Sequence, residues 1–150
     1  FKGVNKLVQK GLDEGLPIPE IAKQLQAAKL FDPARANLIA RTSATRLSNA
    51  AALAAMDEAT DLGLTVFKMW DTAGDDLVRD SHAALDGTVV YSDEFISSAA
   101  GDIQQPAASG EASFDCNCRC NLIPFISQER AEEESERRRP FRETGSPRDY

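Results

Sequence analysis

Apolar residues recur every three or four positions through the first sixty residues, and this spacing predicts helices. Within residues 1–16 the apolar positions are Val4, Leu7, Val8 and Leu12, and after Pro19 they are Ile21, Ala22, Leu25 and Ala28. Asp32-Pro33 predicts the start of a long helix that runs to about Leu62 and ends at Gly63. Residues 49–56 of that helix have few large side chains, which favours close packing against the first two helices or a neighbouring subunit.

The pattern changes after Gly63 to one that favours strands and turns. We expect strands at 64–70, 88–91 and 118–126, a turn at 71–75, a short helix at 76–85, a loop at 97–113, a charged helix after Ser127 and an extended arm from Pro140. The predicted fold class is α+β: an N-terminal helical hairpin and a long Ala-rich helix, then a small antiparallel β-region with a short helix, then a charged helical or extended tail. The expected parts are a helical docking region at 1–63, a small α+β domain with a His/Cys cluster at 64–126 and a charged tail at 127–150.

Composition is that of a globular protein, with 42% hydrophobic and 27% charged residues. No apolar run approaches the roughly 20 residues of a membrane span, and no secretory signal is visible. The first residue is Phe rather than Met, so we expect a piece of a longer protein. Three cysteines without a secretory signal favour thiolate ligation or reduced thiols over a disulfide framework.

The net charge of −7 argues against simple nucleic-acid binding, which needs a basic surface. The candidate basic segment is the arginine-rich tail, formed by Arg137, Arg138, Arg139, Arg142 and Arg148. It directly follows Glu132–Glu134 and Glu136, which partly cancel its field. DNA contact through this tail is therefore expected to be at most an accessory role.

The residues with metal-binding chemistry fall into two short blocks, 70–87 and 116–120, which together hold the only Trp, the only His and all three Cys. On a strand, Cys116, Cys118 and Cys120 would face one side, and a bend would let two thiols share one zinc. His82 would point inward from the short helix, as a core histidine, as a ligand together with Cys118 and Cys120, or as a catalytic residue. The fourth ligand would be Cys116, a carboxylate such as Asp80, or water.

The acidic residues near His82 have a simpler explanation than a calcium site. Asp71, Asp75, Asp76, Asp80 and Asp86 lack the regular order of a calcium loop. Capping, turn formation and pairing with Arg79 account for them. We also predict that Trp70 anchors the core and that Arg41 forms a polar bridge from the long helix to the β-region. No phosphate-binding loop, nucleophile elbow or His-Glu-x-x-His motif is present.

Four pieces of the sequence together resemble the phage Mu F-like head morphogenesis family, the minor head or minor capsid proteins of tailed bacteriophages. The pieces are Ile39–Thr42 leading to Asn49, Trp70, the run Asp75–Gly87 with Arg79, His82 and Leu85, and Asn117–Cys120. The resemblance covers about residues 5–125. Two features depart from it: Leu77 stands where many members have Arg, and Cys116 is not required by the family pattern.

The resemblance implies a structural virion component that acts in head morphogenesis and is not an enzyme. It would be associated with the portal or the major capsid protein, in multiple copies, in the virion and, during assembly, in the host cytoplasm. Some members are fused to a portal protein, which fits the missing initiator Met. The suspected metal ligands of the family fall on His82, Cys118 and Cys120, with zinc as a structural cofactor. The alternative is a metal-dependent hydrolase or nuclease, or an effector-associated module delivered with the DNA.

Overall fold

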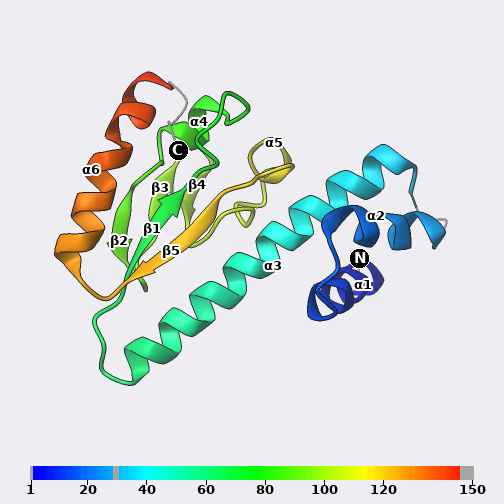
Figure 1. The fold of residues 1–150 in the computed structure, drawn as a ribbon, viewed down its shortest axis with the longest axis horizontal. Coiled ribbons are helices and arrows are strands. Elements are labelled where there is room, and N and C mark those ends of the chain that lie inside the picture. The colour runs from blue at the N-terminus through cyan, green and yellow to red at the C-terminus, as the bar shows by residue number, and fades with distance from the viewer. Residues whose placement is uncertain (1, 29–30, 146–150) are drawn as a thin grey trace.

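The computed structural model describes residues 2–28 and 31–145 and divides them into a helical part and a β-containing part (Figure 1). The helical part comprises α1 (Lys2–Asp13), α2 (Ile18–Ala27) and the first half of α3 (Pro33–Asp61). The rest consists of β1 (Phe67–Asp71), α4 (Asp80–Ala83), β2 (Val89–Tyr91), β3 (Ile96–Ser98), β4 (Gly101–Ile103), α5 (Ala112–Asp115), β5 (Asn121–Phe125) and α6 (Gln128–Thr144). The predicted α+β class is confirmed.

The helical arm, which we define as α1, α2 and residues 33–47, is held together by aliphatic packing. Val8, Ile21, Leu25, Ala36 and Ala40 are completely buried in its core. The predicted start of α3 is confirmed, because the Asp32 side chain accepts a hydrogen bond from the Arg35 amide at 3.1 Å and Pro33 is the first helical residue. The predicted end is confirmed as well, with Gly63 at φ 90° directly after the C-cap.

The β body, which we define as residues 64–145, is built on an antiparallel sheet with the strand order β2-β1-β5. The second half of α3 and the β3–β4 hairpin cover one face, where Met56, Trp70, Ile96, Ile103 and Leu122 share one core. The α6 helix covers the opposite face (Figure 1). Trp70 is completely buried, as expected of a core anchor.

Several expected boundaries in the β body are wrong. The predicted loop at 97–113 contains the end of β3, all of β4 and the start of α5. The two strands form because short polar residues make a tight hairpin at Ser98–Gly101. The predicted helix at 76–85 is only the four-residue α4. The strand β5 begins at Asn121, so the three cysteines precede it rather than lie on it.

The charged segment also differs from expectation, since α6 continues through Pro140 to Thr144 instead of becoming an extended arm. A proline in a helix interior costs about 3 kcal/mol. Here Phe141 is buried and the Arg142 guanidinium donates to the Asp86 carbonyl at 2.8 Å, and these tertiary contacts hold the last turn in place. The helix ends at Gly145 in a left-handed conformation. Residues 146–150, including Arg148, lie outside the described residues.

None of the helices in the described ranges is both long enough and apolar enough to cross a membrane.

Candidate metal centre

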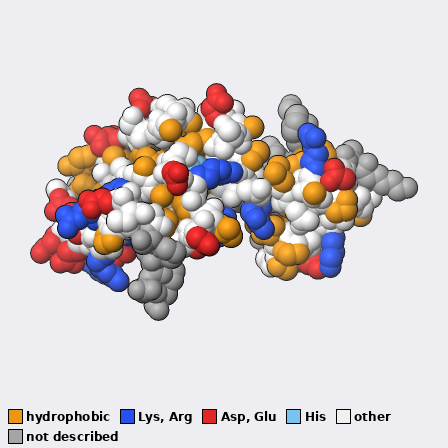
Figure 2. All heavy atoms as spheres, turned by 90° about the horizontal axis from the view of Figure 1, so that it is seen from above, with side chains coloured by type: hydrophobic (Ala, Val, Ile, Leu, Met, Phe, Trp, Pro, Cys, Tyr) orange, Lys and Arg blue, Asp and Glu red, His pale blue; other side chains and the backbone are white. Residues whose placement is uncertain are grey.

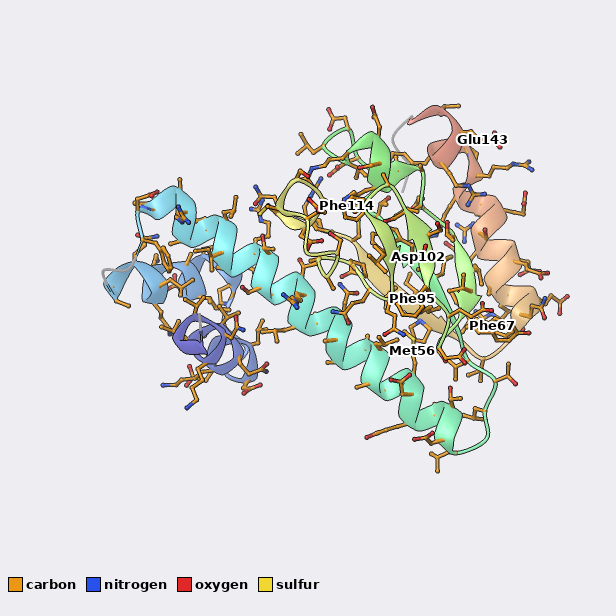
Figure 3. The ribbon with its side chains drawn as sticks, turned by 180° about the vertical axis from the view of Figure 1, so that it is seen from behind. Met56, Phe67, Phe95, Asp102, Phe114 and Glu143 are labelled. Carbon is orange, nitrogen blue, oxygen red and sulfur yellow. The ribbon has the colours of Figure 1, made fainter. Side chains whose placement is uncertain are left out.

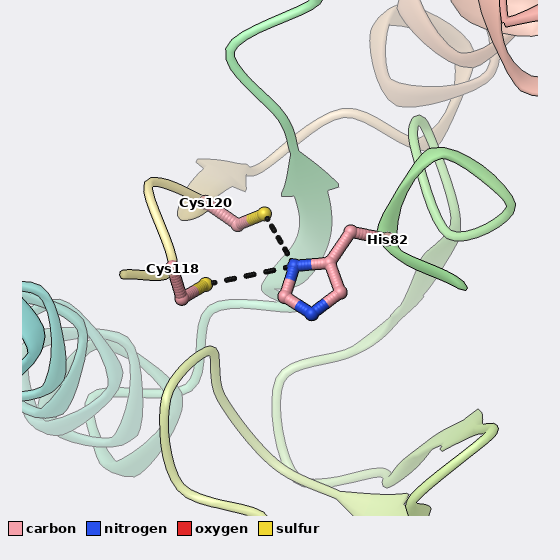
Figure 4. A group of neighbouring side chains, drawn as sticks. All are labelled: His82, Cys118 and Cys120. Atoms are coloured by element: carbon pink, nitrogen blue, oxygen red, sulfur yellow. Dashed lines mark hydrogen bonds between the residues drawn. The ribbon is translucent and has the colours of Figure 1, made fainter. Parts of the chain in front are cut away.

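Three buried side chains from two distant segments meet between α4 and the chain leading into β5. The His82 Nδ1 atom lies 3.3 Å from the Cys120 Sγ atom and 3.7 Å from the Cys118 Sγ atom (Figure 4). All three ligand atoms lie within 4.8 Å of one another. The fold therefore brings together the three residues that the sequence selected as metal ligands. We call this group the His/Cys cluster.

A sharp turn at Asn117, rather than a regular strand, brings the two cysteines to one side. Asn117 has a φ of 57°, a left-handed conformation that Asn tolerates better than most residues. Cys118 and Cys120 follow it and are buried, whereas Cys116 precedes it and is partly exposed. The expectation that all three thiols share a strand face is wrong, and Cys116 is not part of the cluster.

The two nitrogen–sulfur distances of the cluster can be compared with those of a tetrahedral zinc site. Zinc bonds of about 2.3 Å to sulfur and about 2.0 Å to nitrogen place those two atoms about 3.5 Å apart at a tetrahedral angle. The observed distances of 3.3 and 3.7 Å lie on either side of this value. The two nitrogen–sulfur distances are therefore close to those of a tetrahedral site, and the three side chains form a group that could hold a metal ion.

The surroundings of Cys118 and Cys120 favour the thiolate form of Cys118. Hydrogen bonding from Cys120, with a further contribution from His82, lowers the pKa of the Cys118 thiol. The same contact, together with burial, raises the pKa of the Cys120 thiol. The thiolate is the form that binds metals, so Cys118 is the better prepared sulfur ligand.

Aromatic rings hold the imidazole of His82 in its orientation. The Phe114 ring lies 4.2 Å from it, centroid to centroid, and Trp70 meets it edge-on at 6.1 Å. The Nε2 atom of His82 is buried and has no hydrogen-bond partner within the described ranges. The ring therefore presents Nδ1 to the two sulfurs while its other nitrogen sits in apolar surroundings.

A cavity of about 20 Å³ lies beside the cluster and is lined in part by His82, Cys118 and Cys120. Its wall includes Ala73, Leu77, Val78, Asn117 and Arg119. This volume holds about one water molecule. Of the three expected fourth ligands, neither Cys116 nor the exposed Asp80 belongs to the cluster.

Two arginines fix the segment that carries the cysteines. The Arg119 guanidinium forms a bidentate pair with Asp75, with both N–O distances at 2.6 Å, and this contact lowers the pKa of the Asp75 carboxyl group. Arg79 instead donates to the carbonyl groups of Phe114 and Cys116. The expected pairing of the acidic cluster with Arg79 is therefore wrong for Asp75, since Arg119 comes closer from the other block.

Polar side chains on one face of α3 bind the same segment. Thr42 accepts from the Asn117 amide at 3.0 Å, and Thr45 donates to the Cys118 carbonyl at 2.8 Å. The Asn49 amide donates to the Cys120 carbonyl at 3.0 Å and accepts from the Leu122 amide at 2.7 Å. The Arg41 side chain is exposed and forms no hydrogen bond or ion pair with another described residue, so the polar contacts from α3 to this segment come from Thr42, Thr45 and Asn49 instead. Thr45 was missed, although its spacing from Thr42 and Asn49 marks one helix face.

Four of the five arginines of α6, all except Arg130, form side-chain contacts within the β body. Arg138 is buried and pairs with Asp71, with Glu134 at 3.0 Å and with Asp86 at 3.6 Å. Asp86 in turn accepts from the amide and hydroxyl of Thr72, both at 2.8 Å. On the exposed side, ion pairs join Arg137 to Glu134 and Arg139 to Glu136. Much of the basic charge assigned to the tail is thus neutralised by neighbouring carboxylates.

The fold and the cluster define a small α+β module in which a long helix supports a His/Cys/Cys site. Residues 2–123 match the family model described as Phage Mu protein F like protein. The chain belongs to this family. The match covers the arm, the cluster and most of β5, while α6 lies beyond it.

Curated relatives extend the comparison. The chain is 32% identical to Minor head protein GP7 of Bacillus phage SPP1, over 81% of this chain and 40% of that protein. It is 32% identical to NAD(+)--arginine ADP-ribosyltransferase EFV of Enterococcus faecalis, over 83% of this chain and 26% of that protein. It is 30% identical to an uncharacterised protein of Haemophilus influenzae, over 82% of this chain and 24% of that protein. The chain thus spans less than half the length of each of these relatives. No solved structure matches it.

Proposed function

We propose that the chain is the structural module of a phage minor head protein and acts in head morphogenesis within the virion. Family membership and the similarity to Minor head protein GP7 support this role. The proposed partners are portal or major capsid subunits inside the assembling head, where the module is present in several copies. The relative named as an ADP-ribosyltransferase matches over only 26% of its length, so its activity is not transferred to this module.

We further propose that zinc is bound by His82, Cys118 and Cys120 and has a structural role. The observation that carries this proposal is the spacing of the three buried ligand atoms. When bound, zinc would join α4 to the segment before β5, two parts of the chain more than thirty residues apart. Such a link stabilises a small β body whose sheet strands have only three to five residues.

The size of the neighbouring cavity supports a structural role over a hydrolytic one. A catalytic zinc needs an open position and room for a substrate. The cavity of about 20 Å³ accommodates a water molecule but no nucleotide or peptide. The nearby Asp75 is held by Arg119 in a bidentate pair, so it is poorly placed to act as a general base.

Metal content tests the site directly. Elemental analysis and native mass spectrometry of the reduced chain should find about one zinc per chain. The Cys118→Ser and His82→Ala variants should lose the zinc. The Cys116→Ser variant should keep it, because Cys116 lies outside the cluster. A metal-free chain that stays folded would remove zinc from the proposal and leave the cluster as core packing.

The assembly role needs a separate test. In particles made by the phage that encodes the chain, disrupting the module by Trp70→Ala should lower the amount of this protein per head. Quantitative mass spectrometry of purified heads measures that amount against the major capsid protein. An unchanged amount would contradict a role of this fold in incorporation, whatever the metal content.

A further inference from the structure

The charges are distributed unequally between the first 49 residues, which include the helical arm, and the remaining residues, which include the β body. Residues 1–49 contain eight Lys and Arg against four Asp and Glu, a net charge of +4. Residues 50–150 contain nine against twenty, a net charge of −11. Figure 2 shows acidic side chains gathered over the β body. The molecule therefore has a basic end and an acidic end.

The acidic end also exposes apolar side chains. Leu62, Leu64, Tyr91 and Ile126 are 85%, 50%, 47% and 74% exposed. The strand register places them together, because Phe67 lies opposite both Tyr91 and Phe125, the residue before Ile126. The end of α3, the start of β1 and the start of α6 lie toward the same end of the molecule (Figures 1 and 3). We call this surface the acidic end.

Acidic residues surround these apolar side chains. Within 57–64, 91–94 and 126–130 the charged residues are Asp57, Glu58, Asp61, Asp93, Glu94 and Glu129, against the single basic residue Arg130. The Lys68 ammonium group, which is buried beneath them, donates to the Ser92 carbonyl at 2.8 Å and interacts with Asp57, Asp93 and Glu94. An apolar patch with an acidic rim is typical of a protein interface whose partner is apolar and basic.

The helical arm has a surface of this complementary kind. A groove of about 760 Å³ lies between α1 and the start of α3, lined by the apolar residues Val4, Phe31, Leu38 and Ile39 together with Asp32 and Arg35. Arg35 in this lining is exposed and forms no ion pair with another described residue, and the same holds for Lys6, Arg41 and Arg46 elsewhere on the arm. We call the groove lined by Val4, Phe31, Asp32, Arg35, Leu38 and Ile39 the arm groove.

We propose that copies of this chain associate head to tail, with the acidic end of one copy seated on the arm groove of the next. Two acidic ends would repel each other, so a symmetric contact through that surface is disfavoured. A contact between two different surfaces leaves one of each free, and it continues from copy to copy until a ring closes or a filament grows. This inference does not depend on the metal or on the partner in the head.

Sedimentation velocity of the 150-residue chain provides the test. At low ionic strength the chain should self-associate as its concentration rises, and about 0.5 M NaCl should weaken that association because the attraction is partly electrostatic. The acidic-end variant Leu62→Ser with Ile126→Ser and the groove variant Arg35→Glu with Leu38→Ser should each weaken it about tenfold or more. The control variants Leu77→Ser and Arg137→Glu, which change exposed residues elsewhere, should associate like the unmodified chain.

A mixture of the two interface variants distinguishes head-to-tail contact from every other arrangement. Each variant retains one intact surface, so the mixture should form heterodimers and nothing larger. Circular dichroism of each variant checks that the surface changes leave the fold intact. An unmodified chain that stays monomeric at low ionic strength would overturn the proposal. So would an acidic-end variant that still self-associates, or a mixture that remains monomeric.

Discussion

The helical arm and the β body are stabilised in different ways. The arm core consists of aliphatic side chains, and its ion pairs, such as Lys23 with Glu20, are exposed. The β body buries Lys68, Asp86, His82 and Arg138 among its apolar residues, each in a specific set of contacts. Aliphatic cores tolerate changes that keep their volume, whereas buried polar groups require their own partners. The body should therefore be far more sensitive to substitution than the arm.

The largest expected effect is at the centre of the body core. Trp70→Ala should lower the free energy of unfolding by about 3–5 kcal/mol, because it removes a completely buried indole that packs against His82 and Phe114. Urea denaturation followed by circular dichroism measures the change. Phe95→Ala, an aromatic truncation at a position that is 59% exposed, is the control and should cost less than about 0.5 kcal/mol. Equal losses for the two variants would mean that Trp70 is not an anchor.

The next effect concerns the buried ion pairs under α6. Arg138→Met keeps much of the side-chain volume but leaves Asp71 and Asp86 without their shared cation, and should cost about 3 kcal/mol. Arg137→Met removes an exposed arginine from the same helix and should cost less than about 1 kcal/mol. Thermal and urea unfolding of both variants compare the two positions. A stability loss shared equally by them would show that α6 is held by general charge rather than by Arg138.

A smaller loss should follow at the junction between α3 and β5. Asn49→Ala removes the partners of the Cys120 carbonyl and the Leu122 amide, two buried backbone groups, and should cost about 2 kcal/mol. Asn49→Asp retains the acceptor for Leu122 but loses the donor, so it separates the two contacts. If Asn49→Ala unfolded at the same urea concentration as the unmodified chain, this junction would not contribute to stability.

The smallest effect is expected within the arm. Leu25→Met changes the shape but hardly the volume of a completely buried side chain, and should cost less than about 1.5 kcal/mol. The same urea titration serves here, with the helix content from circular dichroism as a second readout. A loss larger than that of Asn49→Ala would remove the proposed difference between arm and body.

The difference between the two regions also explains what the sequence could predict. The arm helices follow from local signals, the Asp32-Pro33 start and the Gly63 end. The β3–β4 hairpin and the last turn of α6 were missed, because tertiary contacts override the local preference of short polar residues and of Pro140. His82, Cys118 and Cys120 could be selected because their residue types are rare in the chain and match the resemblance. Sequence spacing could not show that Arg119 rather than Arg79 pairs with Asp75, or that Asn117 turns the chain.

One helix takes part in both cores. α3 has 29 residues, which corresponds to a length of about 43 Å, and it packs in the arm at Ala36 and Ala40 and in the body at Met56. Since it continues without a break between them, the arm cannot swing independently of the body. A partner protein that binds the arm therefore also determines the direction in which the cysteine-bearing segment faces. The helix acts as a rigid spacer, so that holding one end of the molecule determines the position of the other.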